Sequence, residues 1–414
     1  SASAGTGAIT VGASGTNAFT SAVLTNLGTG NLVITDTAST DALTTVTLSI
    51  GATNAVNSDA LTTLTLTNTV GVTTVTAAAA TRALTVNIGA GTTPSVVDAE
   101  ATTITVNLTS AVTVTLLDFA KAAGATINAT AITTVTALNL DIATTLVLDA
   151  TGGTLTIGDT SAQGNTLTTY TITGTSVVTL SGAELSTGTT TLTSTNTAGA
   201  SVDLNGAGQA ITATFGSGND TVTAFSVDEI IDLGTGNNTL VVGTIVITGT
   251  ATAGSGTADV ISMSAEEALT STTAAKYTGF EVLTLTDNND GAVNTFDASL
   301  ISGITSINVN ADSASDGYSI TNLSAAQAAA ITVSGTQAVD LTFAITDAGL
   351  SGQIDTLAID VNDASATVNT ITLADISAAS VEILNLTATD NIVVTLLTGM
   401  TSLTNLNVTG AGTV

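Results

Sequence analysis

The residues best suited to chemistry lie in one stretch, "FGSGNDTVTAFSVDEIIDLGTGNNTL", residues 215 to 240. Two Gly-x-Gly-Asn turns begin in it eighteen residues apart, at Gly216 and Gly234. Read in frames of nine residues, the stretch keeps a polar residue at the sixth position and an apolar residue at the eighth. The sixth position holds Asp220, Glu229 and Asn238, and the eighth holds Val222, Ile231 and Leu240.

This arrangement predicts a calcium site. Gly-x-Gly turns permit positive φ angles and let backbone carbonyls point toward a shared position. An acidic side chain from a neighbouring turn completes a cage of oxygen ligands, which suits a hard cation that takes six to eight oxygens. Asp220 is the first expected ligand. The full expected set is Gly216, Gly218, Asn219, Asp220, Asp228, Glu229, Asp232, Gly234, Gly236 and Asn238.

The competing interpretation is that Gly-x-Gly-Asn is ordinary turn chemistry in a β-rich protein. Similar turns occur at 27–32 ("LGTGNL") and 253–259 ("AGSGTAD"), where the sequence shows no matching carboxylate in the frame. The metal interpretation is therefore restricted to the 216–238 pair of turns.

The chain contains no Cys and no His. Their absence excludes disulfides, thiolate nucleophiles, Cys- or His-ligated zinc, haem and iron–sulfur sites. It also removes the commonest general base at neutral pH. Polysaccharide cleavage by two carboxylates stays open as a less favoured function, but sugar sites usually need aromatic side chains and the chain has no Trp and three Tyr. We expect a protein that is not an enzyme.

The charge balance directs the choice of partners. Thirty-two acidic residues face three basic ones, Arg82, Lys121 and Lys276, for a formal net charge of −29. Nucleic acid is excluded as a partner, and anionic membrane surfaces are disfavoured. Divalent cations are the simplest counterions, although an acidic surface kept for solubility is the alternative. No uninterrupted apolar segment is long enough to predict a transmembrane helix.

A short pattern, apolar-x-x-apolar-x-apolar, recurs through a chain that has 92 Thr and a single Pro. Its final apolar-x-apolar pair predicts a strand with alternate side chains on one face. In the second half such pairs begin at 283, 307, 331, 357, 384 and 406, in steps of 22 to 27 residues. One strand per 20 to 30 residues predicts a parallel β-solenoid, or β-helix, with apolar ladders inside and Thr ladders outside.

The first half has closer spacing, with pairs at 46, 64, 84 and 104, so β-sandwich domains remain an alternative there. We predict an all-β protein in three parts: a Thr-rich β-domain or solenoid at 1–200, a calcium-binding β-roll at 201–262 and a solenoid at 263–414. A few short helices are expected at 264–277, with Ser264 as N-cap, and at 324–330, with Ser324 and Gln327 as a capping box.

The glycine frames resemble the RTX (repeats-in-toxin) nonapeptide, G-G-x-G-x-D-x-U-x, which forms a calcium-binding parallel β-roll. The first frame matches at Gly216, Gly218, Asp220 and Val222, with Phe215 in place of the first Gly. The third frame matches at Gly234, Gly236 and Leu240, with Asn238 in place of Asp. Together with the Thr-rich, acidic, Cys-free composition, these frames make the chain similar to the RTX-type surface-layer (S-layer) proteins of Gram-negative bacteria.

That resemblance implies a structural protein, exported by type I secretion, that self-assembles into a calcium-stabilised lattice at the cell surface. The implied cofactor is calcium and the implied partner is the protein itself, with cell-surface polysaccharide as a second partner through a part outside this sequence. A calcium-stiffened adhesin or biofilm protein, or an extracellular filament, is the alternative, since a sheet and a fibre need only complementary solenoid surfaces. The terminal sequences show no signal peptide, anchoring domain or secretion signal, so the chain is expected to be one segment of a longer protein.

Overall fold

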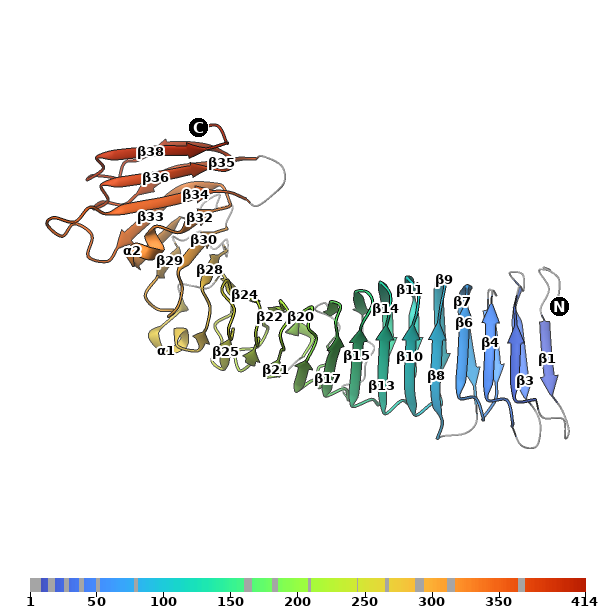
Figure 1. Cartoon of the computed structure of the whole chain (residues 1–414). Helices are drawn as coiled ribbons and strands as arrows, with labels where there is room; N and C mark the ends of the chain where they lie inside the picture. Colours follow the sequence, from blue (N-terminus) through green and yellow to red (C-terminus); the bar gives the residue numbers. More distant parts are fainter. Residues whose placement is uncertain are drawn as a thin grey trace. The chain divides into compact units, whose positions relative to one another are not determined.

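The computed structural model is an all-β parallel solenoid of about 15 turns with almost no helix (Figure 1). This confirms the predicted fold class. The structure describes residues 9–13, 19–25, 30–36, 41–49, 53–77, 81–159, 166–180, 185–207, 210–243, 245–264, 268–286, 294–310, 317–363 and 369–414. The chain divides into two compact units, Ser1–Val222 and Thr223–Val414, which we name the N-terminal and C-terminal units.

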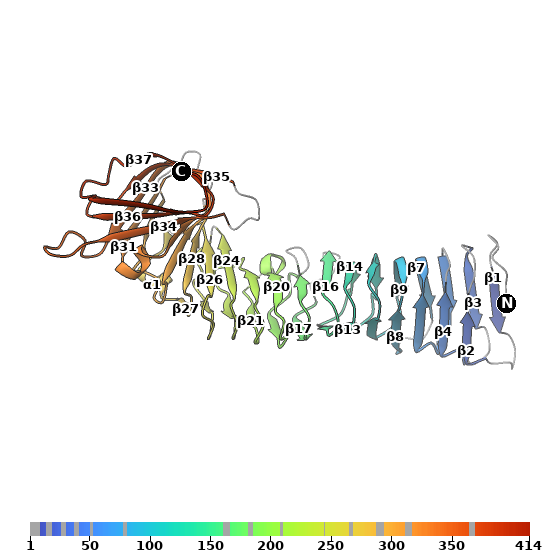
Figure 2. The same ribbon diagram turned by 45° about the horizontal axis from the view of Figure 1, so that its top comes forward.

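In the N-terminal unit every coil contributes strands to two parallel sheets, and successive coils form the rungs visible in Figures 1 and 2. The first sheet consists of β2 (Ser21–Leu24), β4 (Thr45–Ser49), β6 (Thr63–Thr67), β8 (Ala83–Ile88), β10 (Thr103–Leu108), β13 (Gly124–Ala129), β15 (Thr145–Ala150), β17 (Thr169–Gly174), β19 (Thr191–Ser194) and β21 (Thr212–Thr214). The second consists of β1 (Ile9–Ala13), β3 (Leu32–Asp36), β5 (Thr53–Asn57), β7 (Thr69–Thr76), β9 (Gly91–Asp98), β11 (Val112–Val114), β12 (Leu116–Asp118), β14 (Thr133–Asn139), β16 (Leu155–Asp159), β18 (Val178–Leu180) and β20 (Ala200–Asp203). A 3₁₀ turn (Leu204–Gly206) follows β20, and β22 (Thr221–Thr223) includes the boundary between the units.

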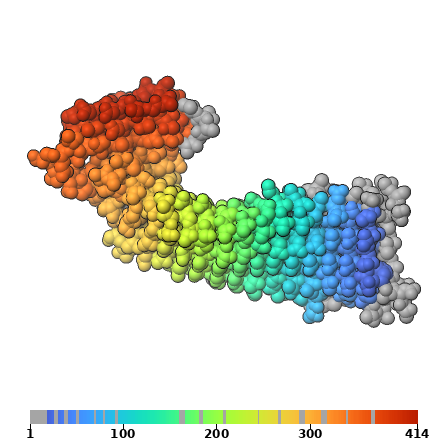
Figure 3. All heavy atoms as spheres, viewed as in Figure 1, coloured from blue at the N-terminus to red at the C-terminus, as the bar shows by residue number. Residues whose placement is uncertain are grey.

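The core of the N-terminal unit is a set of ladders in which each coil places the same face inward. In one ladder Val106 pairs with Ile127, which pairs with Leu148, and all three are buried. Each such side chain contributes about 1.5–3 kcal/mol when it is removed from water. Stacking identical positions therefore gives a continuous apolar interior, and the coils follow one another as bands in Figure 3.

One buried ion pair interrupts this apolar interior. Arg82 is 4% exposed, and its Nη2 lies 2.6 Å from Oδ2 of Asp98, which is fully buried. The Arg82 Nη1 donates to the carbonyl of Leu61 at 3.0 Å. The other carboxylate oxygen of Asp98 accepts the backbone N–H groups of Glu100 and Ala101. The pair thus connects three successive coils through side-chain and backbone contacts.

The C-terminal unit contains three sets of parallel strands. The first set is β24 (Thr239–Gly243), β26 (Val260–Met263), β28 (Val282–Leu285), β30 (Ser306–Val309), β32 (Ile331–Val333), β34 (Thr356–Val361), β36 (Ile383–Ala388) and β38 (Asn405–Gly410). The second set is β23 (Ile230–Asp232), β25 (Thr250–Thr252) and β27 (Tyr277–Thr278). The third set is β29 (Asn294–Asp297), β31 (Tyr318–Leu323), β33 (Gln337–Ile345), β35 (Thr370–Ser377) and β37 (Asn391–Leu396).

The predicted register of the C-terminal strands is confirmed at four of five steps. Leu283 pairs with Ile307 and Ile307 with Ile331, while Leu357 pairs with Leu384 and Leu384 with Leu406. The middle step differs, because Ile331 pairs with Ile359 and not with Leu357. A shift of two residues keeps the same side chains inward, since the period of a strand is two.

The N-terminal half shows the same kind of shift. Val46 pairs with Leu64 as predicted, but Leu64 pairs with Val86 in place of Leu84. Leu84 in turn pairs with Ile104, as predicted. All of these pairs are parallel, so the β-sandwich alternative for this half is wrong: close spacing here reflects short coils and not antiparallel hairpins.

Two short helices lie in the C-terminal unit, α1 (Ser271–Ala274) and α2 (Ala325–Ala328). The predicted capping box of α2 is confirmed, because the Ser324 side chain accepts the Gln327 N–H and the Gln327 side chain accepts the Ser324 N–H. The helix expected at 264–277 is shorter than predicted. Its N-cap is Thr270 and not Ser264, and residues 265–267 are outside the described part of the chain. None of the described helices is long and apolar enough to cross a membrane.

Replacing Ser324 with Ala is expected to cost about 1 kcal/mol of stability, because the first turn of α2 loses its cap. The loss is measured as a lower urea midpoint at an unchanged slope. Ala326→Ser, on the exposed side of the same helix, is the matched control and should cost only a few tenths of a kcal/mol. Equal losses in both variants would contradict the role of the cap.

Candidate functional site

The first glycine turn of the candidate site packs directly on the coil before it. A Cβ at Gly218 would overlap the backbone of Gly199, and one at Gly199 (φ +104°) would overlap the carbonyl of Asn219. A Cβ at Gly216 would lie 3.2 Å from the carbonyl oxygen of Ser194. Close approach of two backbones is therefore the reason for glycine at 218, whereas Gly199 also needs its left-handed conformation.

Asp220 follows this turn and is 1% exposed. Its Oδ1 accepts the backbone N–H of Ala200, one coil earlier, at 2.7 Å. Burial raises the pKa of the Asp220 carboxyl from 3.8 to about 6, although the Ala200 N–H opposes the shift. A buried carboxylate whose ionisation is disfavoured is stabilised most by a bound cation or by protonation.

The second glycine turn lies in the C-terminal unit and also stacks on a glycine turn. Gly234 (φ +68°) and Gly236 (φ +120°) both have positive φ, as the Gly-x-Gly pattern permits, whereas Gly216 and Gly218 of the first turn do not. A Cβ at Gly254 (φ +79°) would overlap the carbonyl of Gly234, and a Cβ at Gly256 would overlap the carbonyl of Gly236. The 234–236 and 254–256 turns are therefore in direct backbone contact, with carbonyl oxygens of the first facing the glycines of the second.

Asn238 occupies the sixth position of its frame and is fully buried. Its backbone N–H donates to Oδ1 of Asp259 at 2.7 Å, and its Nδ2 donates to the carbonyls of Gly236 and Ala253 at 3.2 and 3.3 Å. The backbone N–H of Asp259 donates in turn to Oε2 of Glu281 at 2.9 Å. Asn238, Asp259 and Glu281 thus form a ladder, in which each acidic side chain accepts the N–H of the residue one coil earlier.

The three remaining predicted ligands lie at β23 and make contacts of their own. Glu229 is fully buried, and its carboxylate accepts the backbone N–H groups of Phe225 and Ser226, which closes the turn before the strand. Asp228 is exposed and accepts the hydroxyl of Thr248 at 2.7 Å. Asp232 is also exposed and accepts the N–H of Gly234 at 3.0 Å. The contacts of Glu229 and Asp232 close local turns, whereas the contact of Asp228 with Thr248 joins two coils.

The predicted ligands therefore fall into two groups. Gly216, Gly218, Asn219 and Asp220 belong to the N-terminal unit; Asp228, Glu229, Asp232, Gly234, Gly236 and Asn238 belong to the C-terminal unit. A site shared between Asp220 and the second glycine turn stays a prediction. Within the described residues, no group of three or more His, Cys, Asp or Glu side chains could hold a metal ion. An ion here would depend on backbone carbonyl and amide oxygens beside one or two carboxylates.

One observation fits such a ligand set. Asp259 is fully buried, and among the described residues no donor reaches its Oδ2. A Cβ at Gly256 would overlap both this oxygen and the carbonyl oxygen of Gly236, so the two oxygens flank the same glycine. Oxygen atoms that lie this close together with no donor group between them are suited to a hard cation.

Asp259 and Glu281 were missed by the sequence reasoning. In "AGSGTADVI" one extra residue separates the glycines from the acid, so Asp259 falls out of the nine-residue frame. The signal that would have found it is position relative to the strand. Asp220, Asp259 and Glu281 all immediately precede a strand of their coil, β22, β26 and β28.

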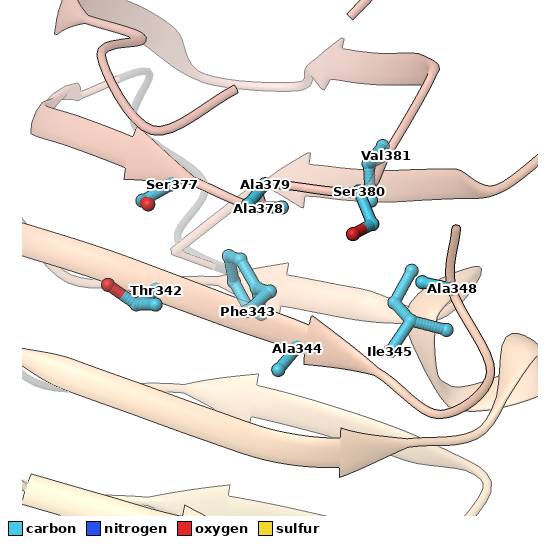
Figure 4. A pocket seen from close by; sticks show the side chains of 10 residues that line it. All are labelled: Thr342, Phe343, Ala344, Ile345, Ala348, Ser377, Ala378, Ala379, Ser380 and Val381. Carbon is cyan, nitrogen blue, oxygen red and sulfur yellow. The ribbon is translucent and has the colours of Figure 1, made fainter. Parts of the chain in front are cut away.

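A pocket of about 240 Å³ lies elsewhere in the C-terminal unit, between the end of β33 and the turn after β35 (Figure 4). Phe343 and Ile345 line one side, and Ala378, Ser380 and Val381 line the other. The pocket forms where β35 ends at Ser377 while β33 continues to Ile345. No acidic or basic side chain lines it, so it offers neither an acid–base pair nor carboxylate ligands.

No family model, curated protein or solved structure matches this chain. The resemblance to RTX-type surface-layer proteins therefore rests on the sequence motifs.

Proposed function

We propose that this chain is a structural protein of an extracellular bacterial surface layer, in which copies associate into a calcium-stabilised lattice. The observation that carries the proposal is the stacking of glycine turns beside buried carboxylates in both units, at Asp220 and at Asp259. In this role the chain has no substrate to convert. The absence of His and Cys from the sequence is consistent with that role.

The charge of the chain supports a cation as part of the assembly. Twenty of the 32 acidic residues and one of the three basic residues lie in the C-terminal unit. Self-repulsion of this size opposes both folding and the approach of a second copy. Calcium, when bound, supplies positive charge and oxygen coordination at the turns. Asp220 in the N-terminal unit, and separately Asp259 with the carbonyls of Gly234 and Gly236 in the C-terminal unit, are the groups that would hold it.

The C-terminal ligand set exists only when the coils are stacked, because the carbonyls of Gly234 and Gly236 and the carboxylate of Asp259 come from different coils. Cation binding is therefore expected to be linked to folding. In a calcium-poor cytosol the acidic chain would remain expanded, and outside the cell it would fold and assemble. Secretion in the unfolded state and assembly at the surface then both follow from the equilibrium between the calcium-free unfolded chain and the calcium-bound folded chain.

Removal of calcium is expected to lower the stability of the chain and disperse the lattice. At a free concentration of 100 times the dissociation constant, one site contributes about 2.7 kcal/mol, which is lost on chelation. Thermal unfolding followed by circular dichroism, with sedimentation and electron microscopy of the assembled material, measures both effects. Magnesium at equal concentration controls for screening by any divalent cation.

The double variant Asp220→Asn, Asp259→Asn is the structural control, because it keeps the hydrogen-bond acceptors and removes the charges. It should unfold at the same temperature with and without calcium. If chelation changes neither fold nor assembly of the unmodified chain, the proposal is wrong. If assembly persists as filaments and not as sheets, the calcium part stands and the surface-layer part is wrong.

A further inference from the structure

One outward face of the N-terminal unit presents a regular array of threonines. Nine strands of the first sheet, from β4 to β21, pair in parallel, and the pairing is continuous, without a bulge, at each of the eight steps. One outward column of paired positions, which runs from Thr45 to Thr214, is threonine in every strand except β15, where it is Val147. We name this face the threonine array.

A second outward column lies two residues away and is also uncharged, apart from one residue. It begins with Thr47 and Thr65 and continues as a ladder of asparagines, in which Nδ2 of Asn107 donates to Oδ1 of Asn87 at 2.7 Å. Its one charged member is Asp149, which accepts the hydroxyl of Thr173. In a chain of net charge −29, a nearly neutral face of this extent is a distinct feature.

The array has two fixed repeats. Neighbouring strands place equivalent hydroxyls about 4.7–4.9 Å apart, and alternate residues of one strand lie about 6.6 Å apart. The β-branched threonine side chain is restricted at χ1, so its hydroxyl and methyl group are held in place before any ligand arrives. Repetition and rigidity together suit a ligand that is itself periodic.

The chemistry of the face excludes the common classes of partner. Its two columns have no Lys or Arg to bind phosphate or nucleic acid. They have no outward aromatic ring on which a sugar could stack, because Tyr170 points into the core and is fully buried. They also lack the Trp, Tyr and Arg anchors that dominate the affinity of protein interfaces.

Crystalline water is a periodic ligand whose oxygen spacing is similar to the spacing of the threonine hydroxyls. In a tetrahedral network of O–H···O hydrogen bonds about 2.7–2.8 Å long, second neighbours lie roughly 4.5 Å apart. That distance is close to the spacing between strands, so hydroxyls of successive coils can replace neighbouring waters of a lattice layer. The methyl groups between them order the adjacent water without offering a competing hydrogen bond. We propose that the threonine array binds the surface of ice.

The test uses the whole chain, folded in calcium-containing buffer and checked by circular dichroism. Thermal hysteresis and partitioning of the protein into a slowly growing ice hemisphere are measured together. The unmodified chain should enter the ice and show hysteresis. The double variant Thr105→Tyr, Thr126→Tyr, which puts two bulky side chains in the middle of the array, should fall to the level of a protein excluded from ice.

The matched control is Thr134→Tyr, Thr156→Tyr, the same change at two paired outward positions of the second sheet. It should leave partitioning and hysteresis unchanged. Val147→Thr, which completes the array, should increase hysteresis, and a gain of this kind has no explanation in misfolding.

Exclusion of the unmodified chain from ice, or equal loss in both tyrosine variants, would overturn the inference. Binding of the array to crystalline polysaccharide, or self-association that the array variants abolish while ice partitioning is absent, would assign the face to that partner. The inference does not depend on the proposed lattice. If the chain binds ice but forms no lattice, the ice inference stands and the lattice proposal is wrong. If it forms a lattice but does not bind ice, the lattice proposal stands and the ice inference is wrong.

Discussion

Replacing Arg82 with Ala is expected to destabilise the N-terminal unit by about 3–5 kcal/mol, the usual cost of leaving one partner of a buried ion pair without its counterion. Asp98 would stay fully buried with only two backbone N–H groups to solvate its charge. The carbonyl of Leu61 would also lose its donor. A loss of this size is a large fraction of the stability of a typical domain, and it is measured by urea unfolding followed by circular dichroism.

Lys121→Ala is the matched control for this prediction. Lys121 forms the other ion pair of the described residues, with Glu100 at 2.6 Å, but half of its side chain is exposed. Pairs of that kind contribute about 0–1 kcal/mol. The double variant Arg82→Met, Asp98→Leu removes both buried charges and should recover much of the stability lost in Arg82→Ala. If Arg82→Ala costs no more than Lys121→Ala, the buried pair has no structural role.

Asp220→Asn is expected to stabilise the calcium-free chain at pH 7. The pKa of Asp220 is raised by burial to about 6 in the folded chain, from 3.8. The folded state therefore binds more protons than the unfolded state between these values, and stability falls as the pH rises through about 6. The whole shift corresponds to about 3 kcal/mol. Asparagine keeps an acceptor for the Ala200 N–H and carries no charge.

The advantage of Asp220→Asn should shrink as the pH is lowered from 6 toward 4, because the aspartate is then protonated in the folded state. Adding calcium at pH 7 should reverse the order, since only the carboxylate binds the ion. Urea midpoints of the variant and of the unmodified chain are measured at pH 4.5 and pH 7, each in EDTA and in calcium, and give the stability difference in all four conditions. Asp141→Asn, at an exposed position, controls for the general gain from removing one negative charge. A destabilised Asp220→Asn in EDTA at pH 7 would refute the prediction.

The period and the alternating pattern of the strands were enough to predict the solenoid, because each coil must bury one face against the next. The same pattern placed Leu283, Ile307 and Ile331 in one ladder. It could not fix the pairing of Ile331 with Ile359, because Leu357 and Ile359 both face inward and either can fill the ladder. Register within one face depends on the lengths of the turns, which the apolar pattern does not contain.

The candidate site was only partly predictable for a related reason. Glycine permits the positive φ of Gly234 and Gly236 but does not dictate it, since Gly216 and Gly218 lack it, and the contact of Gly218 with Gly199 depends on the coil before it. Asp259 is displaced from the nine-residue frame by one inserted residue, and only its place before β26 reveals its equivalence to Asp220. Nothing in the apolar pattern marks Arg82 as buried, since a lone cation in an acidic chain is typical of a surface position.

The unequal coil lengths have a consequence for how such a chain evolves. Equivalent threonines of the array are separated by 18, 22, 20 and 21 residues in the first four steps, yet the strands stay in register. Differences in coil length are taken up by the turns, so an insertion or deletion there need only preserve the inward or outward parity of each strand residue, and the position of that residue along the chain is free to change. Lineages that carry this fold can therefore diverge in length and sequence until no residue-by-residue correspondence remains, while the ladders inside them are unchanged.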